Sequence, residues 1–322
     1  MLEQRIQQQG RILRAPQVRA AIVSVAAGVA ILVFKFAAYL VTGSVAIFSD
    51  AAESVVNVVA ANVALISLVV ATAPPDEGHQ YGHGKAEYIS SATEGGLIVL
   101  AGVWVLVTAI MRFIRPVPLQ HLDWGLLVLV VATVANLLTA RFLLRVSRDA
   151  DSIALEADAR HLLADVLTSV GVLAGLALAW LTGLSWIDAA VAAIVAAHIV
   201  RMGAGVYSRG LRGLMDTSLP AAEEAAIRTI LDAHRNEIVE YHALRARKSG
   251  SARFIDLHLV LHKILTVGQA HALCDDLEEH IEAALPGSDI TIHVEPCGPN
   301  CPRCGLLAEG GVRVHPPAAR RD

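Results

Sequence analysis

The chain has 322 residues, of which 55% are hydrophobic and only 17% are charged, and its apolar residues are concentrated in the first two thirds. This composition is typical of a polytopic membrane protein with a water-soluble C-terminal part, and it excludes an ordinary soluble globular protein. The formal net charge is −4, and no basic stripe carries interleaved aromatic residues. Nucleic acid is therefore not an expected partner.

Apolar runs of the ~20 residues that a helix needs to cross a bilayer recur along the first two thirds of the chain. They predict six spans at about residues 18–42, 45–72, 88–114, 122–146, 154–181 and 186–207. The second and fifth runs are the least hydrophobic because they carry polar residues. A hydropathy window alone can therefore miss one of them.

Lys and Arg in the flanks of these runs predict the orientation of the chain, because cytoplasmic loops carry the excess of positive charge. An even number of spans puts both termini on one side. The basic residues before the first span and after the second, fourth and sixth fall on that side, and only Arg112 and Arg115 fall on the other. We therefore expect a multi-pass protein of the inner (plasma) membrane with both termini in the cytoplasm. Residues 1–17 are expected to form a short cytoplasmic arm and not a removable signal peptide.

After Arg212 the composition changes to charged residues and alternating patterns. Periodicity predicts helices over residues 221–235 and 267–285 and strands over 238–247, 253–262 and 289–296. The order αββαβ indicates a small cytoplasmic α+β domain with two helices on one face of an open sheet, as in ferredoxin-like or metallochaperone-like folds. The expected domains are the arm (1–17), a six-helix transmembrane domain (18–208), the cytoplasmic domain (209–296) and a Cys-containing tail (297–322).

The second and fifth spans share one spacing of polar residues: a first residue, another three positions later and a third four positions after that. On a helix this spacing places all three side chains along one stripe. Charged groups at membrane depth are costly, so chains that keep them usually use them. The two stripes are Asp50, Glu53 and Asn57 in the second span, and Asp158, His161 and Asp165 in the fifth.

Both stripes are rich in oxygen ligands and one carries an imidazole, so together they can form a four-ligand metal site between two helices. This arrangement predicts a metal transporter. Asp50 and Asp158 come first in each stripe. We expect them to support the ligands or the helix packing and not to bind the ion directly.

The loop between the second and third spans contains two imidazoles four residues apart, His79 and His83, with Asp76 three residues before the first. These three side chains can hold one ion, and the loop glycines allow the tight turns that this requires. A flexible connector is the alternative interpretation of such a loop.

The strands of the cytoplasmic domain place further metal-binding side chains on one face. By the period of two, His258 and His262 lie opposite the apolar face of the second strand, and His293 and Glu295 point away from the core in the last. With His242 from the first strand they form a second group of candidate ligands. Ordinary surface histidines are the alternative.

All four cysteines lie at or beyond Cys274, in the part expected in the reducing cytoplasm, where thiols are commoner than disulfides. Cys297, Cys301 and Cys304 fall within eight residues, a spacing that suits a soft metal. Three incidental thiols remain the alternative. The candidates for a fourth ligand are Cys274, His293 and His315.

With these residues in place, the chain resembles the cation diffusion facilitator family, in its bacterial zinc and ferrous-iron efflux branch, from about residue 18 to 296. The motifs that carry the resemblance are Gly43-Ser44, Tyr81–Lys85, His161-x-x-x-Asp165, Leu214-Met215-Asp216, and Arg253-Phe254-Ile255 followed by His258. The resemblance implies a homodimer in the lipid bilayer that exports divalent cations in exchange for protons by alternating access. The cytoplasmic domain would be a regulatory metal-binding domain.

The resemblance also implies the ligands, by matching positions. The transported and regulatory metal is expected to be Zn²⁺, followed by Fe²⁺, with Mn²⁺ and Cd²⁺ as further candidates. Where relatives place two aspartates, this chain has Glu53 and Asn57, which removes one negative charge and leaves the metal preference open. The implied ligands are Glu53, Asn57, His161 and Asp165 for transport; Asp76, His79 and His83 in the loop; and His242, His258, His271, His293 and Glu295 in the cytoplasmic domain.

Two other classes of protein are alternatives to a transporter. A membrane metalloprotease would carry a His-Glu-x-x-His helix, and the sequence has none, so no enzyme is expected. A membrane-anchored metal sensor without transport is the second alternative. An anchor has no need for ligands duplicated in two spans, which favours the transporter.

Overall fold

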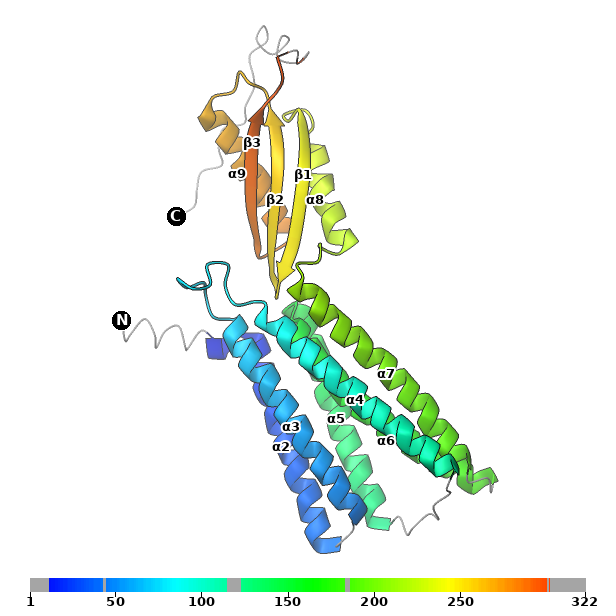
Figure 1. Cartoon of the computed structure of the whole chain (residues 1–322). Coiled ribbons are helices and arrows are strands. Elements are labelled where there is room, and N and C mark those ends of the chain that lie inside the picture. Colours follow the sequence, from blue (N-terminus) through cyan, green and yellow to red (C-terminus); the bar gives the residue numbers. More distant parts are fainter. Residues whose placement is uncertain (1–11, 43–44, 115–122, 183–185, 300, 302–322) are drawn as a thin grey trace, which may run out of the picture. The chain divides into compact units, whose positions relative to one another are not determined.

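The computed structural model describes residues 12–42, 45–114, 123–182, 186–299 and 301 (Figure 1). The chain divides into two compact units, which we call the helical unit (1–215) and the C-terminal unit (216–322). The sequence-based boundary lay between residues 208 and 209. Most of the expected arm, Gly43-Ser44, Arg115 and the tail beyond Cys301 lie outside the described residues.

The helical unit contains six long helices among its described residues, as predicted. Five of them are long and apolar enough to cross a membrane, and α6 is the one outside this group. The N-terminal half of α6 carries four charged residues, which a hydropathy criterion penalises. The helices are α2 (Pro16–Thr42), α3 (Val45–Ala71), α4 (Ala86–Ile114), α5 (Asp123–Asp149), α6 (Ile153–Thr182) and α7 (Trp186–Leu214).

Helices α4 and α7 pack against each other through glycines, a surface that we call the glycine seam. A side chain at Gly95 would overlap the backbone of Tyr207, and a Cβ at Gly210 would lie 2.6 Å from the Ala92 backbone nitrogen. Gly203 likewise faces the α4 backbone. Small residues allow this close approach of two backbones, as in many membrane helix pairs. Helix α7 continues to Leu214, beyond the apolar run expected to end at about residue 207, and Gly210 still packs against α4 there.

The C-terminal unit has the predicted order αββαβ: α8 (Ala221–Ala233), β1 (Glu240–Ser249), β2 (Ala252–Leu261), α9 (Val267–Ala284) and β3 (Ser288–Pro296). The sheet order is β1-β2-β3. β1 and β2 form an antiparallel hairpin, whereas β3 pairs with β2 in parallel after the α9 crossover (Figure 1). The predicted α+β fold class is confirmed.

The core of this unit lies between the sheet and its two helices. Ile255, Leu257 and Leu259 alternate along β2 and are buried against Ile227 of α8 and Leu277 of α9. The opposite face of β2 carries the polar residues of the same strand, because successive side chains point to opposite faces. The fold therefore presents one face of the sheet to possible ligands and uses the other for packing.

Candidate metal centres

The polar stripes of α3 and α6 meet within the helical unit. The amide of Asn57 lies between the two α6 side chains: its Nδ2 donates a hydrogen bond to Asp165, and its Oδ1 is 3.0 Å from His161 Nε2. The other ring nitrogen of His161 is buried and has no hydrogen-bond partner in the described part of the chain. Asn57 thus contacts two of the other three predicted transport ligands, His161 and Asp165.

The fourth predicted ligand, Glu53, lies one helical turn before Asn57 on α3 and is exposed. Within the described residues no hydrogen bond joins it to the other three. It is close enough to Asp165 and His161 to interact with them electrostatically. The structure therefore places Glu53 beside the cluster, at its open side.

The two aspartates expected to support the ligands have different surroundings. Asp50 accepts a hydrogen bond from Lys35 of α2, at 2.8 Å from Nζ. Asp158 is buried near Glu94 of α4, and both carboxylate oxygens of Glu94 are buried without a hydrogen-bond donor in the described residues. Glu94 was not among the predicted site residues, although a carboxylate within an apolar run could have identified it.

The loop ligands are brought together as predicted. Asp76 Oδ1 lies 3.2 Å from His79 Nδ1, and Asp76 Oδ2 lies 3.3 Å from His83 Nε2. The backbone N–H groups of Gly78 and His79 donate to Asp76, at 2.9 and 2.6 Å. The hydrogen bond from the His79 backbone is the main cause of the lowered pKa of Asp76, which keeps the carboxylate ionised as a metal ligand requires. All three ligand atoms lie within 4.8 Å of one another.

A row of histidines crosses the sheet of the C-terminal unit. His242 of β1 pairs with His258 of β2, which pairs in turn with His293 of β3. Glu295 lies next to all three: its carboxylate is 2.8 Å from His258 Nδ1, 3.6 Å from His242 Nε2 and 3.8 Å from His293 Nε2. The ligand atoms of His242, His258 and Glu295 lie within 4.8 Å of one another. We call these four residues the sheet cluster.

A β-bulge follows His242, with Ala243 at φ +50°. A bulge moves the register of a strand by one residue and so changes which side chains share a face. Here it falls between the pair His242–His258 and the pair Arg245–Asp256, so the bulge sets which residue of β2 lies opposite His242.

His271, the remaining predicted ligand, is not part of the sheet cluster within one chain. It lies on α9 and its Nδ1 is 3.6 Å from Asp275 of the same helix.

Two further groups of metal-binding side chains were not predicted as such. One consists of His262, Cys297 and Cys301, whose ligand atoms lie within 4.8 Å of one another. The sequence had indicated the thiols but not His262 as their partner. The other group consists of His234, Asp276 and His280, between α8 and α9.

In the second of these groups, both histidines contact the backbone of the helix that precedes or contains them. The Nδ1 atoms of His234 and His280 contact backbone carbonyl oxygens at 2.8 and 2.7 Å, and Asp276 lies 3.2 Å from His234 Nε2. His234 is the C-cap residue of α8, where a histidine that contacts a carbonyl of the last turn is a common stabilising contact, whereas His280 contacts a carbonyl within α9. This group therefore has a structural role without a metal.

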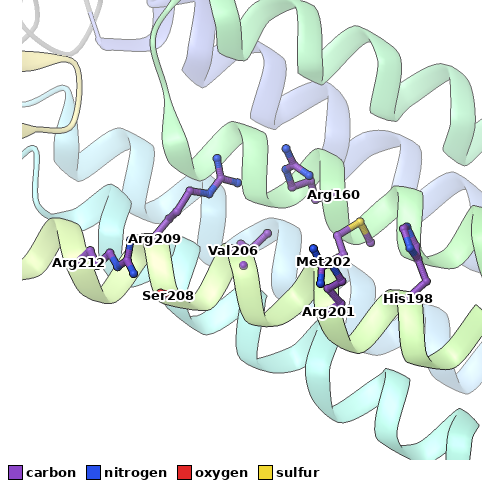
Figure 2. Close-up of a pocket in the computed structure, with 9 residues that line it drawn as sticks. Arg160, His198, Arg201, Met202, Val206, Ser208, Arg209 and Arg212 are labelled. Carbon is purple, nitrogen blue, oxygen red and sulfur yellow. The ribbon is translucent and has the colours of Figure 1, made fainter. Parts of the chain in front are cut away.

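An open pocket of about 510 Å³ lies between α6 and α7. Figure 2 shows Arg160 of α6 opposite several basic side chains of α7, among them Arg201, Arg209 and Arg212. Glu156 accepts hydrogen bonds from Arg160 and Arg209, at 2.8 and 3.0 Å. With one carboxylate among four guanidinium groups, the pocket is cationic and repels metal ions, so it is not a cation site.

Both units match domains of one group of known proteins. The cation efflux transmembrane domain matches residues 21–215, and the cation efflux protein cytoplasmic domain matches residues 219–297. The chain is 38% identical over 276 residues to the uncharacterized transporter sll1263 of Synechocystis sp., which covers 86% of this chain and 89% of that protein. It is 34% identical over 278 residues to the cation-efflux pump FieF of Klebsiella pneumoniae, covering 86% and 92%.

A solved structure of CzrB in its zinc form, from a protein proposed to be a zinc transporter, is 40% identical to the matching part of this chain. The match covers 27% of this chain and 98% of that structure, with a TM-score of 0.25.

Proposed function

This chain belongs to the cation efflux (cation diffusion facilitator) family, and we propose that it exports Zn²⁺ from the cytoplasm in exchange for protons, with Fe²⁺ as the closest alternative cargo. It is a multi-pass membrane protein of a cation transporter family. The proposed assembly is a homodimer in the inner membrane, in which each chain has both termini in the cytoplasm. The name of its FieF relative, a cation-efflux pump, supports the export of a cation.

The observation that carries the proposal is the contact of Asn57 with both His161 and Asp165. It joins side chains of two helices that the sequence separates by more than 100 residues. Glu53 lies next to these three residues and supplies a second carboxylate. Two carboxylates, an amide and an imidazole can together bind a divalent cation. Among the described residues, Lys35 is the basic side chain that acts electrostatically on Glu53 and Asp165, and it is already paired with Asp50.

The same ligands provide for exchange with protons. An imidazole nitrogen or a carboxylate oxygen can hold a metal ion or a proton but not both, so metal binding releases protons. His161 and Asp165 are the groups that would alternate in this way, because each has an ionisable atom at the cluster. When the cluster faces the outside, protonation of these two groups favours release of the metal.

The loop ligands and the sheet cluster are proposed to bind regulatory Zn²⁺. In each group, nitrogen and oxygen ligand atoms of three residues lie within 4.8 Å of one another. A small movement of these side chains toward one another would place the atoms around a divalent ion. Binding at these sites would favour transport only to the extent that the metal binds more tightly to one conformation than to the other.

Asn57→Asp tests both transport and cargo. Wild type and variant would be reconstituted in proteoliposomes with an imposed pH gradient, and uptake of Zn²⁺, Fe²⁺, Mn²⁺ and Cd²⁺ would be measured. The variant adds a carboxylate, so that both predicted ligands on α3 are acidic, and we expect gradient-dependent uptake in both proteins and a shift of the variant toward Zn²⁺ and Cd²⁺. Asn62→Asp is the matched control, because Asn62 lies on the same helix and its amide donates to the Val58 carbonyl outside the cluster.

Asp165→Ala separates transport from sensing. Loss of flux with metal still bound by the C-terminal unit supports transport through the cluster. If wild type moves no ion in any condition while it binds metal tightly, the chain is a membrane-anchored sensor and the proposal is wrong.

A further inference from the structure

The parallel pairing of β2 with β3 brings His262 and Cys297 together. The C-terminal ends of the two strands lie at the same end of the sheet (Figure 1), where Leu261 pairs with Pro296. The backbone N–H of Cys297 continues the ladder and donates to the Leu261 carbonyl at 2.8 Å. The first residue after each strand is therefore held beside the other by backbone hydrogen bonds. His262 and Cys297 are both buried, with 4% and 6% of their surface exposed.

Cys301 approaches the same point by a tight turn. Its backbone N–H donates to the Gly298 carbonyl at 3.2 Å, which folds the chain back over Cys297. Its Sγ atom lies 4.0 Å from His262 Nδ1. Cys301 is only partly buried, so the group has one side open to the solvent through which an ion can enter.

The distances are close to those of a tetrahedral site. Zinc binds thiolate sulfur at about 2.3 Å and imidazole nitrogen at about 2.0 Å, so neighbouring ligand atoms of one Zn²⁺ lie about 3.5–3.8 Å apart. The 4.0 Å between Cys301 Sγ and His262 Nδ1 needs only a small contraction. Two thiols and one imidazole are also a ligand set that prefers zinc or a softer cation over Mg²⁺, Ca²⁺ or Mn²⁺.

This group is separate from the sheet cluster. His258 lies within β2, and His262 follows the last residue of that strand, four positions later, which corresponds to ~13 Å of extended chain and is too far for one ion. The sheet cluster offers nitrogen and oxygen ligands, whereas this group offers two sulfur atoms and one nitrogen. The C-terminal unit therefore holds two ligand sets of different softness, one within the sheet and one just beyond the ends of β2 and β3.

We propose that His262, Cys297 and Cys301 form a separate thiolate metal site, in which these three side chains of the described part of the chain bind Zn²⁺. Binding deprotonates the two thiols and so releases two protons. The site forms whether or not the helical unit transports zinc.

The test is a titration of the full-length protein in detergent, reduced and free of metal, with Co²⁺ as the probe. Thiolate-bound Co²⁺ gives a charge-transfer band in the near ultraviolet and tetrahedral bands in the visible. The titration uses a Cys274→Ser/Cys304→Ser background, in which Cys297 and Cys301 are the remaining thiols. We expect one equivalent of Co²⁺ to produce these bands and Zn²⁺ to abolish them.

Single changes then assign the ligands. Cys297→Ser and Cys301→Ser should each lose much of the charge-transfer band, and His262→Asn should alter the visible bands while the thiolate band remains. His258→Asn, which changes the sheet cluster, should leave the thiolate charge-transfer band unchanged, because the sheet cluster contains no sulfur ligand. Cys274→Ser as the single substitution in the wild-type chain is the matched control. Cys274 is buried in α9, where desolvation raises the pKa of its thiol to about 11, so it is a poor metal ligand.

The proposal is overturned if the background protein gives no thiolate band, or if the band survives both Cys297→Ser and Cys301→Ser. Cys301 follows the last strand and is only partly buried. Its substitution therefore serves as the deciding variant if Cys297→Ser does not fold. Circular dichroism of each variant reports folding independently of the metal.

Discussion

The ammonium group of Lys35 on α2 lies 2.8 Å from the carboxylate of Asp50 on α3. Lys35 is buried, and Asp50 precedes Glu53 by one helical turn. The pair joins two helices of the helical unit, and its charges cancel each other beside the candidate transport ligands. An unpaired charge at this position would change both packing and metal affinity.

Replacement of Lys35 by Met should destabilise the helical unit by about 1–3 kcal/mol, because it leaves Asp50 without its cation in a largely apolar environment. Asp50→Asn in the same chain should recover most of the loss. Thermal unfolding of the four proteins of this double-mutant cycle, followed by tryptophan fluorescence in detergent, measures the coupling. Equal melting temperatures for wild type and Lys35→Met would mean that the pair contributes nothing.

Replacement of Glu94 by Leu should raise the stability of the helical unit by about 1–4 kcal/mol. Both Glu94 oxygens are buried without a donor in the described residues, and an apolar side chain of similar size avoids that cost. Glu87, on the same helix, is the contrast. Its Oε2 accepts from Ser152 Oγ at 2.6 Å and from the Ala154 backbone at 3.3 Å.

Glu87→Leu should therefore lower the melting temperature, whereas Glu94→Leu raises it. A loss of stability in both variants would show that Glu94 is satisfied in the membrane by groups outside the described residues.

The Glu223–Arg253 ion pair should make the C-terminal unit sensitive to acid. Arg253 donates to both carboxylate oxygens of Glu223, at 2.7 and 3.0 Å, and these hydrogen bonds lower the pKa of Glu223. A lowered pKa in the folded state contributes stability above the ordinary carboxyl pKa, and this contribution is lost as the pH falls through the lowered value. Glu223→Gln should cost about 1 kcal/mol at neutral pH and nothing at a pH below the folded pKa.

The free energy of opening of β2 amides, from hydrogen exchange at each pH, measures this difference. Glu224→Gln is the control, since Glu224 forms an exposed pair with Arg228 on the same helix and should change stability by no more than a few tenths of a kcal/mol. A constant difference between wild type and Glu223→Gln across the pH range would contradict the assignment.

The glycine seam predicts opposite effects of one substitution at two positions of α7. Gly210→Ala should destabilise by about 1–3 kcal/mol, because its Cβ would meet the Ala92 backbone at 2.6 Å. Gly205→Ala should be neutral or stabilising by up to ~1 kcal/mol, because no atom lies within 4 Å of its Cβ and alanine favours the helix. Thermal unfolding in detergent compares the two, and similar losses at both positions would rule out the seam as the cause.

Local periodicity was sufficient to predict the helices and strands, and spacing was sufficient to predict the meeting of α3 and α6. The stripe of Asn57 and the stripe of His161 and Asp165 each lie on one helix face, so only their convergence had to be inferred. The sixth apolar run was predicted to end at about residue 207, whereas the helix continues to Leu214.

Contacts between residues far apart could not be predicted in the same way. The partner of the tail thiols is His262, and this follows from the register of β2 with β3, which no local pattern contains. The pairing of Lys35 with Asp50 likewise depends on how α2 packs on α3. The predicted ligand role of His271 remains a prediction, since within one chain its contact is Asp275.

The seam between α4 and α7 has a consequence for motion. Where glycine brings two backbones into contact, there are no long side chains to slide or change rotamer, so these helices can change their relative position only by losing the contact altogether. If the protein opens alternately to the two sides of the membrane, α4 and α7 form its fixed wall, and the opening must be made by the helices around them. A pair of spectroscopic labels across the seam would then report a constant distance throughout the cycle.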